Sequence, residues 1–141
     1  IEFHSVDLNI KIKNKSRIIS WFSETADTYN KELVDINIIF TKDNYLLEIN
    51  KKYLKKNYYT DIITFNYNEE DKISGDIFIS IERVKENAQI FSKSQNEELK
   101  RILIHGILHL IGFNDITEEE TREMRKAENR SLNNVNNLII I

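Results

Sequence analysis

A chain of 141 residues is long enough for one compact domain with a single hydrophobic core and too short for two, so we expect residues 1–141 to form one domain. Its formal charge of −3 at pH 7 excludes binding of nucleic acid through overall positive charge, although a local basic patch remains compatible with RNA binding. The absence of cysteine excludes disulfides and thiolate chemistry. With no apolar run near ~20 residues and no signal-peptide pattern, the sequence predicts a cytoplasmic protein with no membrane partner.

The first half of the chain predicts strands and helices in alternation. Its strands are indicated by period-two patterns and by β-forming residue types, and its helices by an apolar face and a capping residue at the start. In chain order, the expected elements are a strand within 1–13, a helix capped by Ser16, a strand over 33–40, a helix from Asp43, and strands over 61–67 and 75–80 joined by an acidic loop.

Three helices are expected in the second half. Ser80 is the expected cap of a helix over 81–92. Capping boxes mark the starts of the other two helices, Ser94 with Glu97 and Thr117 with Glu120. Residues 133–141 are either a frayed end or a last strand docked on the domain. The order βαβαββααα predicts an α+β domain with helices packed on one small mixed sheet.

The run HGILHLIGFND, residues 105–115, has the spacing of a three-ligand metal site. Residues four apart on a helix lie one turn above each other, so His105 and His109 can direct two imidazole nitrogens at one ion. Gly112 can end the helix in a left-handed conformation, and the reversed chain brings Asp115 toward the same ion. Because catalytic zinc sites have three protein ligands and one open position, this pattern predicts one catalytic zinc per chain at the end of a central helix.

Two other interpretations of this segment remain. Histidine pairs at this spacing arise by chance on many helices, and the apolar neighbours of His105 and His109 are compatible with ordinary core or surface residues. If the chain is shifted by a few residues after the glycine, the third ligand is Glu118 or Glu119 at the start of the next helix instead of the aspartate.

Three segments resemble motifs of the bacterial YbeY family, which consists of single-domain, zinc-dependent endoribonucleases implicated in ribosomal RNA maturation. HGILHLIGFND resembles H-G-x-L-H-L-x-G-Y-D-H, NKKYLKKNYYTDIITF from Asn50 to Phe65 resembles N-x-x-Y-R-x-K-D-x-P-T-D-V-L-S-F, and GDIFIS from Gly75 resembles G-D-I-x-I-S. The resemblance implies an α+β fold, zinc at the helix end, a cytoplasmic setting, and partners that are ribosomal RNA and small ribosomal subunit components. The implied activity is single-strand-specific cleavage of RNA, in 16S rRNA 3′-end maturation and ribosome quality control.

The chain departs from the family pattern at two functional positions. Asp115 stands in place of the family's third zinc-binding histidine, and because aspartate also ligates zinc, it remains the expected third ligand. Leu54 stands in place of an arginine expected to face substrate phosphate. The neighbouring Lys55 and Lys56 are candidate substrate-binding residues without arginine's bidentate geometry, the alternative being a solvated pair on a loop.

The expected chemistry is that of a metal-activated water. Zinc lowers the pKa of a bound water toward ~7 and polarises a phosphoryl oxygen, so a side-chain base is not required. Asp61 and Asp76 are candidates for orienting a ligand or acting in catalysis, with a turn-capping or strand-end role as the alternative.

Two rival functions share these residues. A zincin-like metalloprotease has the ligand spacing H-E-x-x-H-x-x-G-x-x-H, but Gly106 here replaces the glutamate that acts as its general base. The other rival is a non-catalytic ribosome-assembly binding module in which the metal only stabilises the fold, which the loss of the arginine at Leu54 favours.

Overall fold

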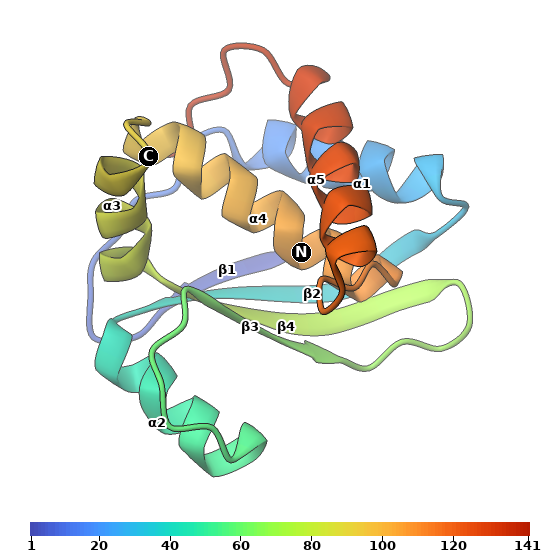
Figure 1. The fold of residues 1–141 in the computed structure, drawn as a ribbon. Coiled ribbons are helices and arrows are strands. Elements are labelled where there is room, and N and C mark those ends of the chain that lie inside the picture. Colours follow the sequence, from blue (N-terminus) through green and yellow to red (C-terminus); the bar gives the residue numbers. More distant parts are fainter.

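A mixed sheet of four strands in the order β1-β2-β4-β3 organises the chain (Figure 1). In the computed structural model, which describes all of residues 1–141, β1–β2 and β2–β4 are parallel pairs and β3–β4 is antiparallel. The elements are β1 (Glu2–Ser5), α1 (Lys15–Thr28), β2 (Glu32–Thr41), α2 (Asp43–Leu54), β3 (Ile62–Asn66), β4 (Lys72–Ser80), α3 (Ile81–Ile90), α4 (Gln95–Ile111) and α5 (Glu118–Asn133). The predicted order and the α+β class are confirmed, and no helix is both long and apolar enough to cross a membrane.

The N-terminal segment differs from the prediction. The strand expected within 1–13 covers only Glu2–Ser5, because the chain turns at Asp7, whose φ is 56°. The alternating apolar residues beyond that turn, such as Ile10, pack against the core without forming strand pairs. Ser16 does not cap the first helix: α1 begins at Lys15 after Asn14, which has a φ of 59° and makes no side-chain capping bond.

The predicted caps of the later helices are largely confirmed. The Ser80 hydroxyl accepts a hydrogen bond from the Arg83 N–H at the start of α3. The Thr117 capping box is complete, because Thr117 and Glu120 each accept a bond from the other's backbone N–H. At α4 only half of the predicted box forms, with the Ser94 hydroxyl accepting from the backbone N–H three residues on.

The C-terminal tail is neither a strand nor a frayed end. Residues 134–141 form no helix or strand, yet Val135, Leu138 and Ile140 are buried in the core. The Asn96 side chain on α4 donates to the Leu138 carbonyl at 2.8 Å and accepts from the Ile140 N–H at 2.7 Å. Together with a backbone bond from the Lys13 N–H to the Ile140 carbonyl, these side-chain hydrogen bonds hold the tail on the domain without a strand.

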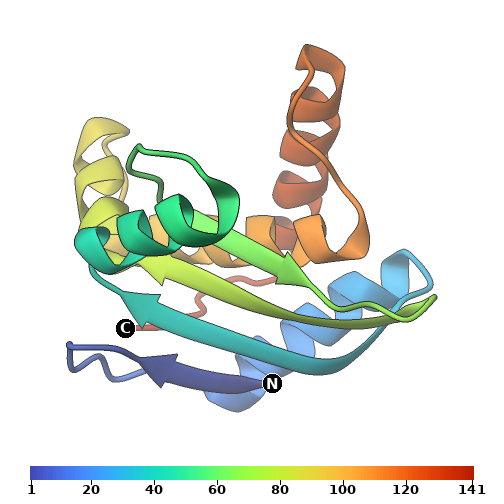
Figure 2. The same cartoon turned by 90° about the horizontal axis from the view of Figure 1, so that it is seen from below.

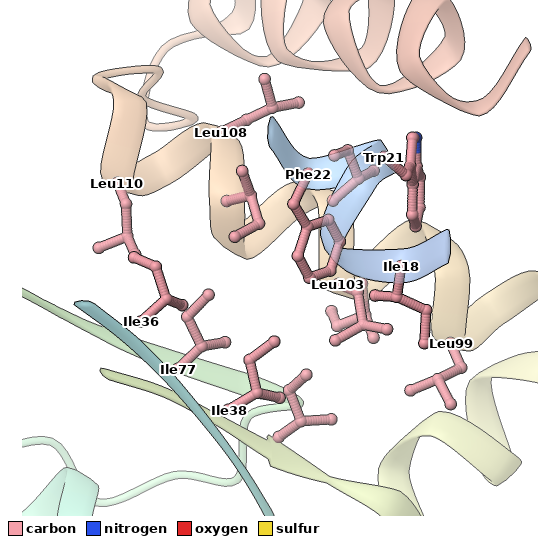
Figure 3. Packing of buried hydrophobic residues seen from close by; sticks show 14 of the residues in the cluster. Ile18, Trp21, Phe22, Ile36, Ile38, Ile77, Leu99, Leu103, Leu108 and Leu110 are labelled. Atoms are coloured by element: carbon pink, nitrogen blue, oxygen red, sulfur yellow. The ribbon is translucent and has the colours of Figure 1, made fainter. Parts of the chain in front are cut away.

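The main core lies between one face of the sheet and the helices α1 and α4. Ile36 and Ile38 of β2 and Ile77 of β4 point toward Phe22 of α1 and Leu103 of α4 (Figure 3). One face of α4 is buried, and its members are Leu99, Leu103, Gly106 and Leu110. Seen from below in Figure 2, α2 covers the β3 side of the opposite sheet face, while β1 and β2 have no helix over them there.

Two glycines allow α4 to lie very close to the sheet. A Cβ atom at Gly106 would lie 2.9 Å from Ile62 Cδ1 and 3.0 Å from Ile77 Cγ2. A Cβ atom at Gly75 would lie 2.5 Å from the Phe65 carbonyl oxygen and 2.8 Å from a methyl carbon of Leu110. This close approach sets the position of α4 over β4, and with it the position of both histidines.

We expect Gly75→Ala to lower the free energy of unfolding by about 2–3 kcal/mol, because the added methyl group meets a backbone oxygen held in the β3–β4 pair. Gly106→Ala should cost less, because the ends of isoleucine side chains can rotate away and alanine favours the helix. Urea unfolding of both variants and the parent measures the difference. A Gly106→Ala protein less stable than the Gly75→Ala protein would contradict this account of the packing.

Candidate metal centre

The end of α4 and the turn after it bring three potential metal ligands together. Gly112 ends the helix with a φ of 129°, and its N–H bonds back to the carbonyl of His109. The chain reverses, and Asp115 Oδ2 lies 3.3 Å from His105 Nε2 and 3.4 Å from His109 Nε2. The two Nε2 atoms are 2.9 Å apart. The structure therefore places the three sequence-predicted ligands at one point.

The second nitrogen of each ring is already hydrogen-bonded. His105 Nδ1 lies 2.7 Å from Glu128 Oε2, and His109 Nδ1 lies 3.0 Å from the Phe113 carbonyl oxygen. Because a carboxylate and a carbonyl only accept, both Nδ1 atoms carry the proton, and a neutral ring then has its lone pair on Nε2. Two lone pairs at 2.9 Å repel each other, so a cation between them, either a shared proton or a metal ion, stabilises this arrangement.

The donor set and its spacing fit a tetrahedral zinc ion. Ligand atoms that lie about 2.0–2.2 Å from a tetrahedral ion are separated from one another by roughly 3.3–3.6 Å. The two distances from Asp115 match this range, and the two nitrogens need to separate by only a few tenths of an ångström. Two imidazoles and one carboxylate leave the fourth position open, as in catalytic zinc sites.

The electrostatics of the two histidines differ. Burial lowers the pKa of His105, but the hydrogen bond and the charge of Glu128 outweigh it and hold this pKa above its ordinary value. The pKa of His109 is lowered by burial and by the neighbouring His105 charge. Burial raises the pKa of Glu128, but hydrogen bonds from His105 and Arg101 hold it below its ordinary value. Glu128 therefore stays ionised and orients the His105 ring.

Glu128 is a site residue that the sequence analysis did not include. Its side chain on α5 is only 5% exposed, and Arg101 Nη1 donates to its second oxygen at 2.7 Å. Metal-bound histidines commonly donate their other N–H to a carboxylate, which fixes the ring and its tautomer. The sequence feature that could have identified Glu128 is its position as an acidic residue on the apolar face of α5. The other buried residues of this face are Met124, Ala127 and Ser131.

A cavity of about 320 Å³ opens beside His105 and Asp115. It follows the face of α4 that is flanked by α3 and α5, which lie on either side of this helix in Figure 1. Asp61, at the start of β3, lines the cavity and accepts a 3.4 Å hydrogen bond from the Asn87 amide. Burial raises the pKa of Asp61 in spite of the His105 charge. The structure thus keeps Asp61 as a candidate residue of the site.

Asp76, the other candidate for a site role, points away from the metal ligands. Its neighbours Gly75 and Ile77 face α4, so the alternation of the strand directs Asp76 to the opposite face of the sheet. There it accepts hydrogen bonds from the Asn37 amide at 3.1 Å and from the Tyr67 hydroxyl at 3.2 Å. These contacts favour the strand-end role that was the alternative for Asp76.

The other predicted residues lie outside the cavity. Lys55 ends α2 with a φ of 54°, and both it and Lys56 are exposed on the loop that leads to β3 without lining the cavity. Leu54 is 41% exposed at the end of the same helix. Glu118 and Glu119 are exposed in the first turn of α5 and do not join the two histidines, so the alternative third ligands find no support.

Together these features define an α+β domain with a candidate His-His-Asp metal site at the end of a largely buried helix. A model of the family described as Endoribonuclease YbeY matches residues 1–136. The chain therefore belongs to the YbeY endoribonuclease family.

Similar proteins agree with this assignment across nearly the full length. An Endoribonuclease YbeY of Parabacteroides distasonis is 46% identical over 132 residues, which cover 94% of this chain and 93% of the relative. That of Flavobacterium psychrophilum is 44% identical over 126 residues, covering 89% and 90% of the two chains. Among solved structures, the solution structure of TM1509 from Thermotoga maritima matches with a TM-score of 0.63 at 25% identity, covering 95% of this chain and 91% of that one.

We expect Asp115→Asn to weaken zinc retention, because a neutral amide oxygen is a poorer zinc ligand than a carboxylate. Glu118→Gln, which changes a nearby exposed carboxylate in the same way, should bind zinc like the parent. Elemental analysis after dialysis against a graded series of zinc buffers measures retention. If the Glu118→Gln protein loses zinc and the Asp115→Asn protein retains it, the third ligand is Glu118 and not Asp115.

We expect Glu128→Gln to reduce zinc affinity by about 10- to 100-fold, because the His105 ring loses the charged acceptor that orients it. Glu123→Gln on the exposed face of the same helix is the matched control and should leave the affinity unchanged. Competition with a chromogenic chelator gives both dissociation constants. If the two variants bind zinc with equal affinity, Glu128 does not contribute to metal binding.

Proposed function

We propose that this chain is a zinc-dependent, single-strand-specific endoribonuclease in which His105, His109 and Asp115 hold one zinc ion. The observation that carries the proposal is the convergence of two Nε2 atoms and one carboxylate oxygen within 3.4 Å of one another, beside an open cavity. Membership of the YbeY family supports the substrate class, because the full-length relatives are endoribonucleases by name.

Zinc at this position supplies a bound water of lowered pKa and a Lewis acid for a phosphoryl oxygen. The residues of the chain position and tune this chemistry. Glu128 and the Phe113 carbonyl hold the two histidine rings in the tautomer that leaves Nε2 free. Asp115 adds a negative charge that a third histidine would not, which makes the site a weaker Lewis acid than a three-histidine site.

We propose that Asp61 transfers a proton at the phosphate undergoing cleavage. It lines the same cavity as His105 and Asp115, and burial raises its pKa above the ordinary value of an aspartate, which favours a role in proton transfer. Its Asn87 partner holds the carboxylate at the cavity wall. Asp61 is therefore placed to accept a proton from the attacking oxygen or to give one to the leaving oxygen.

The remaining elements of the proposal concern partners and setting. Lys55 and Lys56 are exposed and lie six and five residues before Asp61 in the chain, so we propose that they contact the RNA backbone outside the cavity. Family membership supports a role for this single domain, residues 1–141, in 16S rRNA 3′-end maturation and ribosome quality control. The corresponding partners are ribosomal RNA and small ribosomal subunit components, in the cytoplasm.

The structure adds an argument against a metalloprotease. Gly106 occupies the position of the protease general base, but it faces the sheet, where even one added carbon would meet Ile62 and Ile77. A glutamate at this position could not point into the site without displacing α4. The other rival function, a non-catalytic ribosome-assembly binding module, differs from the proposed enzyme in that it does not cleave RNA.

We expect the zinc-loaded protein to cut single-stranded RNA and to leave double-stranded RNA and a denatured protein substrate intact. A chelator should abolish cleavage, added zinc should restore it, and His109→Ala should remove it together with the bound zinc. Gel analysis of the three substrates with and without chelator measures these outcomes. Cleavage that persists in chelator, or cleavage of the protein substrate, would refute the proposed function, and RNA binding without cleavage would identify a binding module.

A further inference from the structure

Phe91 is an exposed aromatic residue at the mouth of the metal-site cavity. It is the C-cap residue of α3, its side chain is 60% exposed, and it belongs to neither hydrophobic cluster. No other phenylalanine, tyrosine or tryptophan lines this cavity. Its neighbour Ile90 is similarly exposed, at 64%, but does not line the cavity. The Phe91 ring therefore offers a free aromatic surface beside the site of proposed chemistry.

Arg125 lies on the other side of the same cavity, on α5. Of the two arginines that line the cavity, Arg101 is engaged, because it donates to Glu128 at 2.7 Å and to Asn129 at 2.9 Å. Arg125 is 60% exposed and lies 3.4 Å from Glu128, whose closer partners are Arg101 and the His105 ring. Its contact with Glu128 is the longest of the three, and its guanidinium remains largely exposed, where it can also bind an anion.

An exposed aromatic face and an exposed guanidinium on two walls of one cavity match the chemistry of a nucleotide. Bases of single-stranded RNA stack on aromatic side chains, whereas the bases of a duplex are already stacked on their neighbours. Arginine binds phosphate oxygens through a planar, bidentate fork. The volume of about 320 Å³ is at the lower end of the range for small-ligand sites and suits one nucleoside-sized group.

We propose that Phe91 and Arg125 are substrate-binding residues that hold one nucleotide of single-stranded RNA in the cavity, with its base on the Phe91 ring and a flanking phosphate at the Arg125 guanidinium. The inference rests on the proposed function and adds to it the residues that select an unpaired strand. It also accounts for Leu54, which stands where the family pattern has an arginine. In this chain, Arg125 on α5 supplies the phosphate-binding arginine instead.

Steady-state cleavage of a short single-stranded RNA by the zinc-loaded protein tests the role of Phe91. Phe91→Ala should raise KM by about 5- to 100-fold with little change in kcat, because stacking is lost equally from the bound substrate and the transition state. Ile90→Ala removes an equally exposed apolar side chain next to it and should behave like the parent. With 2-aminopurine in the RNA, the fluorescence change on binding should be lost only in the Phe91→Ala protein.

The role of Arg125 is tested by the salt dependence of KM for the same RNA. Arg125→Gln should weaken binding and reduce the slope of log affinity against log salt by about 0.7, the value for one phosphate contact to a single strand. Arg122→Gln, an exposed arginine on the same helix that does not line the cavity, is the control.

The outcomes separate the inference from the proposed function. If the parent protein cleaves RNA, but Phe91→Ala and Arg125→Gln match their controls in KM, salt slope and fluorescence, the inference is overturned and the endoribonuclease remains. If the parent neither cleaves nor binds RNA, the proposed function itself is overturned. Unchanged zinc content in all four variants confirms that the metal centre is intact.

Discussion

The hydrogen bond between His105 Nδ1 and the Glu128 carboxylate connects the elements on which the site depends. It joins α4, which holds two of the three candidate ligands, to α5, which forms a wall of the cavity. It also determines which nitrogen of His105 carries the proton, and so which nitrogen faces Asp115 and His109. This one contact thus connects the two helices of the site and determines which nitrogen of His105 is free to bind a metal ion.

Such a contact is stable only when the buried charge is compensated, since an unpaired buried carboxylate is strongly unfavourable. Arg101 supplies the compensation, as its guanidinium bonds the oxygen of Glu128 that His105 leaves free. The glycines at positions 75 and 106 make a second contribution, because they let α4 pack on β4 closely enough to bury one face while the histidine face borders the cavity. Charge pairing and close packing together hold the histidine donors in position.

The parts of the site that could be predicted from the sequence are those set by local geometry. The spacing of His105, His109 and Asp115 around a glycine depends on one helix and one turn, and the structure brings these residues together as expected. Motif resemblance gave the family, which the comparison over residues 1–136 confirms. Helix order followed from periodicity and capping residues, whose hydrogen bonds are also local.

The parts that could not be predicted depend on tertiary packing. Asp76 is adjacent in sequence to a glycine that faces α4, and only the alternation of a paired strand shows that its side chain points to the opposite face. Glu128 reaches His105 from 23 residues away through the angle between two helices. The strand expected over 1–13 ended early because apolar side chains can pack on a core without pairing their backbone.

The most direct test of the central claim is a crystal structure of the zinc-loaded protein with anomalous diffraction measured at the zinc edge. The account predicts one anomalous peak per chain, about 2.0–2.2 Å from His105 Nε2, His109 Nε2 and a carboxylate oxygen of Asp115. Nδ1 of His105 should still lie within hydrogen-bonding distance of Glu128. A peak coordinated through Nδ1, a peak bound by Glu118 or Glu119 in place of Asp115, or no peak between the two histidines would contradict it.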